Sequence, residues 1–370
     1  MNELNQNKEV YSEEDCVNVI TLMTINDECD LLIGIATHFR EPNFSNCSLP
    51  YHALFCVEVA DRLKEMGIPF TSSCNGVFDI KATRTRLKLF NDKLGKVIKL
   101  INCIYQDQDQ IFGSRLRYGW MRRRNMYYNM GIYFYKNKII ANTYYLISLF
   151  DKKDGHYDEL NGNDVFDFAR GIGRTLRSVS DISAGIQRNE PDLHDIDITV
   201  LYKDININRR KLFAIEGAES KFMGILMLNV LGNINFTLYL IEDIVGHNTW
   251  KLRSQYISMY YAKEMLMRVA ERTDDFEIAK RISTRIDELN PIFNLCFRNC
   301  MMHYSYSQNG AILIREEYFD IEKPLFGLVE SCFDGMSYDK LSDMVKGNLK
   351  MMGNLIESMM VMNFSKLKRF

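Results

Sequence analysis

One stretch of this chain, from Phe222 to Ile241, contains no charged side chain. Its length is close to the roughly 20 residues that cross a bilayer, so it must be buried either in lipid or in a protein core. The stretch holds Asn229, Asn233 and Asn235, whose amides would lack partners in hydrocarbon. We therefore expect a buried core helix rather than a membrane span, and a protein without a membrane partner.

The amino-acid composition excludes several further classes of protein. The 370 residues carry 46 Lys+Arg against 48 Asp+Glu, and this near-neutral balance argues against a protein whose whole surface packages nucleic acid. Only 6 prolines occur, against 20 methionines and 22 phenylalanines, which favours long helices. The 9 cysteines form no CxxC pair, so zinc and thioredoxin spacings are missing from the sequence. We expect reduced thiols, no metal site and no cofactor.

The pattern of apolar residues predicts an all-α protein with two helical parts. An N-terminal helical domain, regulatory or sensing, is expected over residues 1–150, a connecting region over 151–210, and a helical bundle over 211–370. In the first domain the predicted helices cover 12–38, 49–66, 83–105 and 115–150, the last with at most one interruption. The connecting region is rich in Gly, Asp and Asn, with a short helix near 164–178 and a short strand at 196–202.

Capping residues divide the second half more sharply. Predicted helices cover residues 212–244, 249–272, 274–289, 290–309 and 337–362. Asn248 is the expected cap of the second helix, Asn290-Pro291 the expected start of the fourth, and Asn309-Gly310 its expected stop. The last helix is rich in methionine, which indicates a core or dimer contact.

The fourth of these helices carries an unusual polar group on an apolar background. Arg298, Asn299 and His303 stand among Phe297 and several cysteine and methionine residues. Asn299 and His303 are four residues apart and share a helix face, and the long Arg298 side chain can reach the same place. Burying such a group costs free energy unless the protein uses it.

This pattern resembles the Rx4-6H motif of the HEPN superfamily, in the form with a polar residue after the arginine. The resemblance covers about residues 249–362. It implies an all-helical bundle, usually a homodimer, and a metal-independent endoribonuclease of cytoplasmic toxin, antiphage-defence or stress-response systems. By position, Arg298, Asn299 and His303 would be catalytic, and RNA the substrate. Ser305 stands where some toxin members carry a tyrosine, so we infer no antitoxin partner.

These residue types suit RNA cleavage by the ribose 2′-hydroxyl. Histidine can take or give a proton near neutral pH. Arginine can hold phosphate oxygens with a bidentate fork while charge develops on the phosphorus. The expected product is a 2′,3′-cyclic phosphate. The alternative is a helical RNA-binding, protein-binding or scaffold protein that performs no chemistry.

Two basic patches are weaker candidates for RNA binding. Arg122, Arg123 and Arg124 follow Trp120 and precede two tyrosines, and cations interleaved with aromatic rings suit phosphate contact and base stacking. The second patch lies on the predicted helix before the motif and consists of Lys280, Arg281 and Arg285. Either patch is also compatible with an ordinary solvent-facing helix surface.

Overall fold

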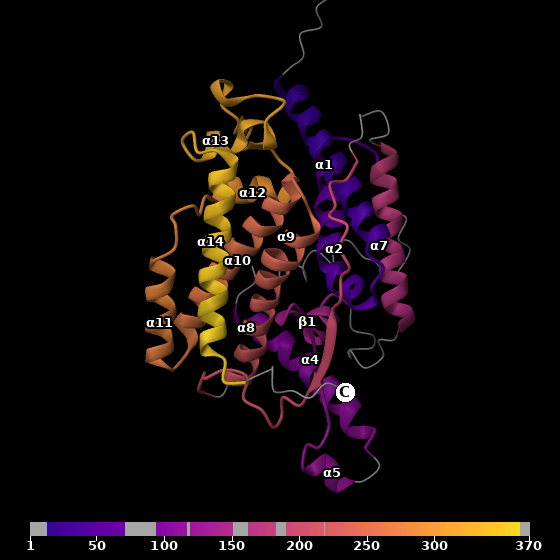
Figure 1. Cartoon of the computed structure of the whole chain (residues 1–370), viewed down its shortest axis with the longest axis vertical. Helices are drawn as coiled ribbons and strands as arrows, with labels where there is room; N and C mark the ends of the chain where they lie inside the picture. The colour runs from indigo at the N-terminus through magenta and orange to yellow at the C-terminus, as the bar shows by residue number, and fades with distance from the viewer. Residues whose placement is uncertain are drawn as a thin grey trace, which may run out of the picture.

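The computed structural model describes residues 13–70, 94–116, 119–150, 162–182, 190–217 and 219–362. Within them the fold is mostly helical with small antiparallel sheets. The longer helices are α1 (Glu13–His38), α2 (Pro42–Glu65), α4 (Leu94–Ser114), α7 (Gly162–Ile182), α8 (Ser220–Asn235), α10 (Thr249–Arg272), α11 (Phe276–Asp287), α12 (Leu295–His303) and α14 (Tyr338–Met359). In Figure 1, α1, α2 and α7 form one side of the molecule, and α10, α11 and α14 form the other.

The uncharged stretch lies at the centre of the fold. It belongs to α8, which continues through a π-helical turn (Phe236–Leu240) into α9 (Ile241–Ile244). By length and hydropathy this segment could cross a membrane, yet 83% of its most apolar window is buried inside the protein. Its amides have protein partners: Asn229 accepts from Asn142, Asn233 accepts from Tyr51, and the Asn235 amide donates to a backbone carbonyl of the sheet.

The long helix predicted over residues 115–150 is wrong. The segment forms a short helix α5 (Gly119–Arg123), a hairpin of β1 (Met130–Tyr135) and β2 (Lys138–Asn142), and a short helix α6 (Thr143–Ile147). Lys136 and Asn137 connect the strands with φ of 45° and 63°, as a tight hairpin turn requires. Because both faces of β1 are buried, its residues read as a continuous apolar run, which does not distinguish a strand from a core helix.

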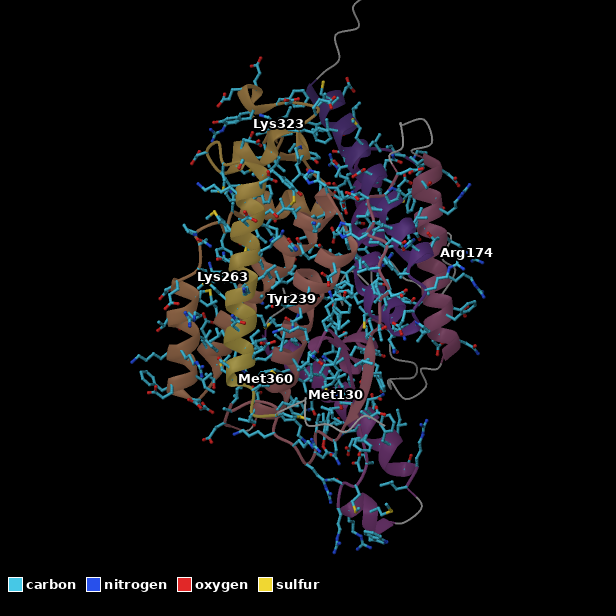
Figure 2. All side chains as sticks on the ribbon, viewed as in Figure 1. Met130, Arg174, Tyr239, Lys263, Lys323 and Met360 are labelled. Atoms are coloured by element: carbon cyan, nitrogen blue, oxygen red, sulfur yellow. The ribbon has the colours of Figure 1, made fainter. Side chains whose placement is uncertain are left out.

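The third strand comes from the predicted connecting region. Strand β3 (Leu201–Ile205) pairs antiparallel with β1, so the sheet order is β2-β1-β3. It begins five residues after the start of the strand predicted at 196–202 and overlaps it only at Leu201 and Tyr202. The helix predicted at 164–178 is present as α7. Figure 2 shows Arg174 on the outer side of α7, whereas Ile172 and Leu176 are buried against the neighbouring helices.

The hydrophobic core forms two clusters, and each contains side chains from all three predicted regions. One cluster joins α1, α4 and the sheet to α8, α10, α12 and α14. The other joins α1, α2, α7 and the opposite face of the sheet to α9 and Trp250. Alternate residues of β1 enter different clusters, Ile132 and Phe134 the first and Tyr133 and Tyr135 the second. The division into a sensing domain and a bundle stays a prediction.

Most helix boundaries of the second half agree with the predicted ones. Asn248 caps α10, Asp275 caps α11, and Ser337 caps α14. Helix α8 begins at Ser220 rather than at residue 212.

In the first half of the chain, helix α2 begins at Pro42, earlier than predicted, because Glu41 caps it and proline suits its first turn. Of the helix predicted at 83–105, residues 94–105 lie in α4 and the rest falls outside the described residues.

The helix that carries the motif is shorter than predicted. It begins after its cap Asn294 rather than at Asn290-Pro291, and it ends at His303. The predicted stop, Asn309-Gly310, is instead the turn of a small hairpin between β4 (Ser307–Gln308) and β5 (Ala311–Ile312). Both turn residues have positive φ, 52° and 79°, a backbone conformation that Asn and Gly adopt at little cost.

Candidate functional site

Helix α12 packs against α10 and α2 and buries one of its faces in the core. The Asn294 side chain accepts a hydrogen bond from the backbone N–H of Phe297 at 3.0 Å and so fixes the start of the helix. Phe297, Cys300, Met301 and Met302 are buried and anchor the helix. Arg298, Asn299 and His303 are each half-buried. The structure therefore places the three motif residues on one short, firmly packed element.

His303 contacts a carboxylate from the other half of the chain. Its Nδ1 lies 2.6 Å from Oε2 of Glu58 on α2. The Glu58 side chain is 1% exposed, and that of His303 is 34% exposed. When Glu58 is ionised its oxygens can only accept, so Nδ1 is then the donor of this hydrogen bond. Nε2 then holds a lone pair in neutral imidazole, and it has no hydrogen-bond partner within the described part of the chain.

Arg298 carries a charge that no described carboxylate neutralises. Its Nη1 donates to Oδ1 of Asn299 at 2.9 Å, and its guanidinium carbon lies 5.1 Å and 5.7 Å from the ring centres of Tyr260 and Tyr261. Its Nε is buried and makes no hydrogen bond to the described residues. Burial raises the pKa of Tyr261 to about 12, while the nearby charge of Arg298 acts in the opposite direction. Arg298 thus keeps its charge uncompensated by any described carboxylate while its side chain is only half-buried.

A buried ion pair fixes the end of α12. Arg253 of α10 donates through Nε to Glu28 at 2.7 Å, and its Nη1 donates to the carbonyls of Cys300 and Met301. Carbonyls in the last turn of a helix lack intrahelical partners, so Arg253 satisfies groups that would otherwise be orphaned. The Tyr304 hydroxyl donates to the second oxygen of Glu28 at 2.6 Å.

These contacts hold the backbone next to His303 in a defined shape. Tyr304 follows the histidine with φ of 53°, in the left-handed region that costs a non-glycine residue free energy. Its ring lies against Arg253, 4.1 Å from the guanidinium carbon, and its hydroxyl is tied to Glu28. Burial raises the pKa of Glu28, and the charge of Arg253 opposes that rise. The ion pair is a support for the motif helix rather than an accessible reactive group.

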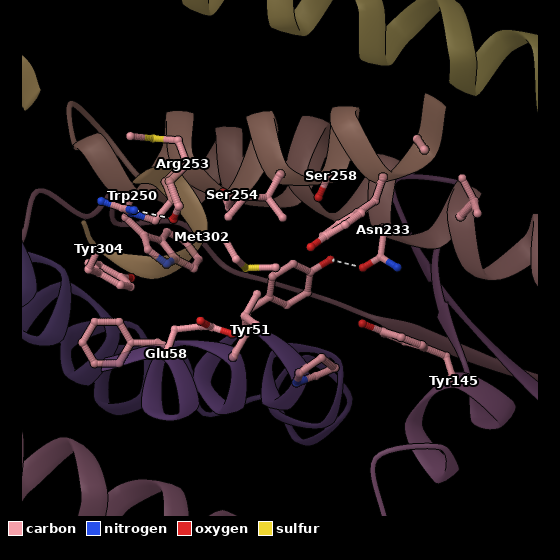
Figure 3. Close-up of a pocket in the computed structure, with 18 residues that line it drawn as sticks. Tyr51, Glu58, Tyr145, Asn233, Trp250, Arg253, Ser254, Ser258, Met302 and Tyr304 are labelled. Atoms are coloured by element: carbon pink, nitrogen blue, oxygen red, sulfur yellow. Dashed lines mark hydrogen bonds between the residues drawn. The ribbon is translucent and has the colours of Figure 1, made fainter. Parts of the chain in front are cut away.

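A small, mainly apolar cavity of about 70 Å³ lies between α2, α8 and α10, next to Glu58. Figure 3 shows Glu58 and Tyr51 projecting from α2 toward α10, with Asn233 and Ser258 across from them. Tyr51 donates to Asn233 at 2.8 Å. The Tyr261 hydroxyl lines this cavity and has no hydrogen-bond partner among the residues described. The cavity thus places a buried donor close to the carboxylate that holds His303.

The two predicted basic patches lie elsewhere. Lys280, Arg281 and Arg285 line a hollow of about 870 Å³ between α11 and α14. Acidic side chains share this hollow, and Arg285 is paired with Glu288 while Arg281 donates to Ser358 at 2.8 Å. Its charge is therefore mixed.

The other patch belongs to α5 and the turn after it, which lie at the lower tip of the molecule in Figure 1, whereas α12 lies in the upper half. Arg123 and Arg124 are exposed there, and the side chain of Arg122 lies outside the described set. Among the side chains that the structure describes, those of neither patch hydrogen-bond to Arg298, Asn299 or His303.

Sequence reasoning missed Glu58, Glu28 and Arg253. Glu58 gives a signal in the sequence, since it is the one charged residue in the apolar run Phe55–Ala60. A carboxylate on the buried face of a helix needs a partner. The identity of that partner depends on a contact between residues 245 positions apart in the chain, which local patterns do not encode.

No family model, curated protein or solved structure matches this chain. Among the described residues there is no group of three or more His, Cys, Asp and Glu side chains placed to hold a metal ion.

Proposed function

We propose that this protein is a metal-independent endoribonuclease of the HEPN type, with Arg298, Asn299 and His303 in its active site. The observation that carries the proposal is the contact of His303 with buried Glu58, together with an arginine on the same short helix that has no carboxylate partner in the described structure. The pairing supplies an oriented proton acceptor, and the arginine supplies a site for the phosphate.

The proposed reaction follows from the donors and acceptors of this site. Nε2 of His303 accepts the proton of the ribose 2′-hydroxyl, and the 2′-oxygen forms a bond to phosphorus. The bond from phosphorus to the 5′-oxygen breaks, and the leaving oxygen takes a proton from an imidazolium or from water. The products are a 2′,3′-cyclic phosphate and a 5′-hydroxyl. Glu58 keeps the Nδ1 proton in place and favours the imidazolium that forms.

Arg298 would stabilise the negative charge that develops on the phosphorane. Its hydrogen bond to Asn299 and the tyrosine rings beneath it restrict the guanidinium, so little conformational entropy is lost when it binds phosphate. Asn299 therefore acts as a positioning residue for Arg298. The resemblance to the superfamily also supports a homodimer, a cytoplasmic location and a role in defence, toxin or stress responses, and we propose these together with the activity.

The test is cleavage of total RNA by purified protein in EDTA. The wild type should cut and His303→Ala should cut at least about 100-fold more slowly, since a positioned general base contributes about 100- to 10,000-fold. A matched control is His38→Ala, because His38 also pairs with a carboxylate, Asp195 at 3.6 Å, but at the surface. Equal cleavage by the wild type and His303→Ala would refute the proposed active site.

A non-catalytic binding or scaffold protein is the second candidate. The observation that favours it is that the contact between His303 and Glu58 joins α12 to α2 across the molecule, a role that needs no chemistry. On this account His303→Ala lowers the free energy of unfolding, and the wild-type protein shows no cleavage above that of a mock purification.

A further inference from the structure

The lower tip of the molecule carries exposed aromatic rings among arginines. Trp120 of α5 is 48% exposed and Tyr128 is 52% exposed. The guanidinium carbon of Arg124 lies 5.7 Å from the Trp120 ring centre, a cation–π contact that leaves much of the indole open to solvent. Large exposed aromatic rings cost free energy in water unless a partner covers them. In Figure 1 this segment projects away from the body of the fold.

A second basic segment is fastened to this tip. Arg209 donates from Nε to the backbone carbonyl of Arg124 at 3.0 Å, and the Asn206 amide donates to the carbonyl of Asn125. These bonds join residues 206–211, which follow β3, to the turn after α5. We call residues 119–128 and 206–211 together the arginine arm. The two parts are almost 80 residues apart in the sequence, so only the fold shows that they adjoin.

Four arginines of the arginine arm are not neutralised within the described structure. Arg123, Arg124, Arg209 and Arg210 are exposed, and none forms an ion pair with a described carboxylate. The adjacent Asp109 is occupied, since it accepts hydrogen bonds from Tyr127 and Asn208, both at 2.6 Å.

A hollow of about 270 Å³ adjoins the arm and is lined by Arg209, Arg210, Lys211 and Lys221. Lys211 makes only a 3.9 Å contact with exposed Glu216. The hollow is large enough for a phosphate group and presents several positive side chains to it.

We propose that the arginine arm is a binding site for single-stranded nucleic acid, separate from the site at His303. Arginines without carboxylate partners can hold consecutive phosphates, and open aromatic faces can stack on unpaired bases. The bases of a duplex are already stacked on one another and cannot stack on these rings, so a duplex would contact only the arginines and should bind more weakly. The binding itself does not depend on cleavage, although in a ribonuclease the arm would hold the strand at a distance from the cut.

Binding is measured with the full chain and a labelled 2′-O-methyl uridine 20-mer, which has no free 2′-hydroxyl and cannot be cut by the proposed reaction. Trp120→Ala should weaken binding about 5- to 150-fold, the range for loss of one stacked base. The double variant Arg123→Gln/Arg210→Gln removes two cations that make no other described hydrogen bond. It should reduce the slope of log Kd against log salt concentration by about 1.4, because each contact to a single strand contributes about 0.7.

The matched control is an exposed pair of the same kind on α7. Phe166 is 60% exposed and lies 4.4 Å from the guanidinium carbon of Arg170, but Arg170 is paired with Asp167. Phe166→Ala and Arg170→Gln should leave binding unchanged. Circular dichroism checks that each variant is folded.

Three results would overturn the proposal: no binding by the wild type, equal binding by wild type and Trp120→Ala, or a duplex bound as tightly as the single strand. Vesicles containing phosphatidylserine test whether the arm binds an anionic membrane surface instead of nucleic acid. If Trp120→Ala abolishes vesicle binding while leaving the oligonucleotide bound, the arm is a membrane contact instead. Because the probe cannot be cleaved, a negative result in this binding experiment refutes the binding site alone. It says nothing about cleavage, which is tested separately with the His303 variant.

Discussion

Replacing Glu58 by glutamine tests how His303 is prepared for catalysis. The substitution keeps the size of the side chain and removes the charge that lies 2.6 Å from Nδ1. A hydrogen bond to a charged group contributes about 1.5–3 kcal/mol, and at 1.36 kcal/mol per tenfold the loss corresponds to a kcat about 10- to 150-fold lower. The KM should change little, because Glu58 is buried and does not reach the substrate.

The proton position on His303 can be observed directly. The chain has only 6 histidines, so long-range ¹H–¹⁵N correlation spectra of a histidine-labelled sample are assignable by single substitutions. We expect the Nδ1–H tautomer in the wild type and a mixture in Glu58→Gln, whose amide can donate as well as accept.

The matched control is Glu65→Gln, the same change at the surface end of α2, where Glu65 lies 3.5 Å from Arg62. It should leave kcat and the tautomer unchanged. If the wild type carries its proton on Nε2, or if Glu58→Gln retains full activity, the reasoning about this pair is refuted.

Three further predictions follow from single contacts. Arg298→Lys keeps the charge but loses the guanidinium fork, so kcat measured on RNA should fall about 10- to 150-fold, and an unchanged kcat would exclude Arg298 from the reaction. Arg253→Ala leaves Glu28 charged and buried, so urea denaturation should show a loss of about 3–5 kcal/mol, whereas Glu28→Leu/Arg253→Met should recover most of it. Burial lowers the pKa of the His52 imidazole in the folded protein below its ordinary 6.5. As the pH falls, the unfolded chain therefore protonates His52 before the folded protein does, and the free energy of unfolding decreases as the pH drops through and below 6.5. His52→Gln should lose less stability than the wild type between pH 7 and pH 5, and parallel pH profiles would contradict this.

The helical character of the chain was readable from its sequence because caps and periodicity are local properties. Asn248, Asp275 and Ser337 each accept a hydrogen bond from the first turn of their helix, and this depends on a few neighbouring residues. The hairpin of β1 and β2 was missed because its strands are buried on both faces and lack the alternation of a half-exposed strand. Lys136-Asn137 also gives little indication of a hairpin turn, because the strong sequence marker of such a turn is a glycine in the second position.

In the candidate site, too, some residues could be predicted from the sequence and others could not. Arg298, Asn299 and His303 lie within one turn and a half of a helix, so their spacing is visible in the sequence. Glu58 becomes meaningful only when α2 packs beside α12, and Arg209 only when β3 pairs with β1. Long-range packing decides both contacts. Local sequence patterns single out the candidate groups, and the fold determines which other groups contact them.

The central claim, attack by the ribose 2′-hydroxyl at a site containing His303, is tested most directly by a single atom of the substrate. Once a cleaved RNA position is mapped, the same oligonucleotide is made with a 2′-deoxynucleotide on the 5′ side of the scissile phosphate. The account predicts that the all-ribose strand is cut to a 2′,3′-cyclic phosphate and a 5′-hydroxyl, that the single deoxy substitution abolishes the cut, and that His303→Ala cuts neither strand. Cleavage of the deoxy-substituted strand at the same position would contradict it.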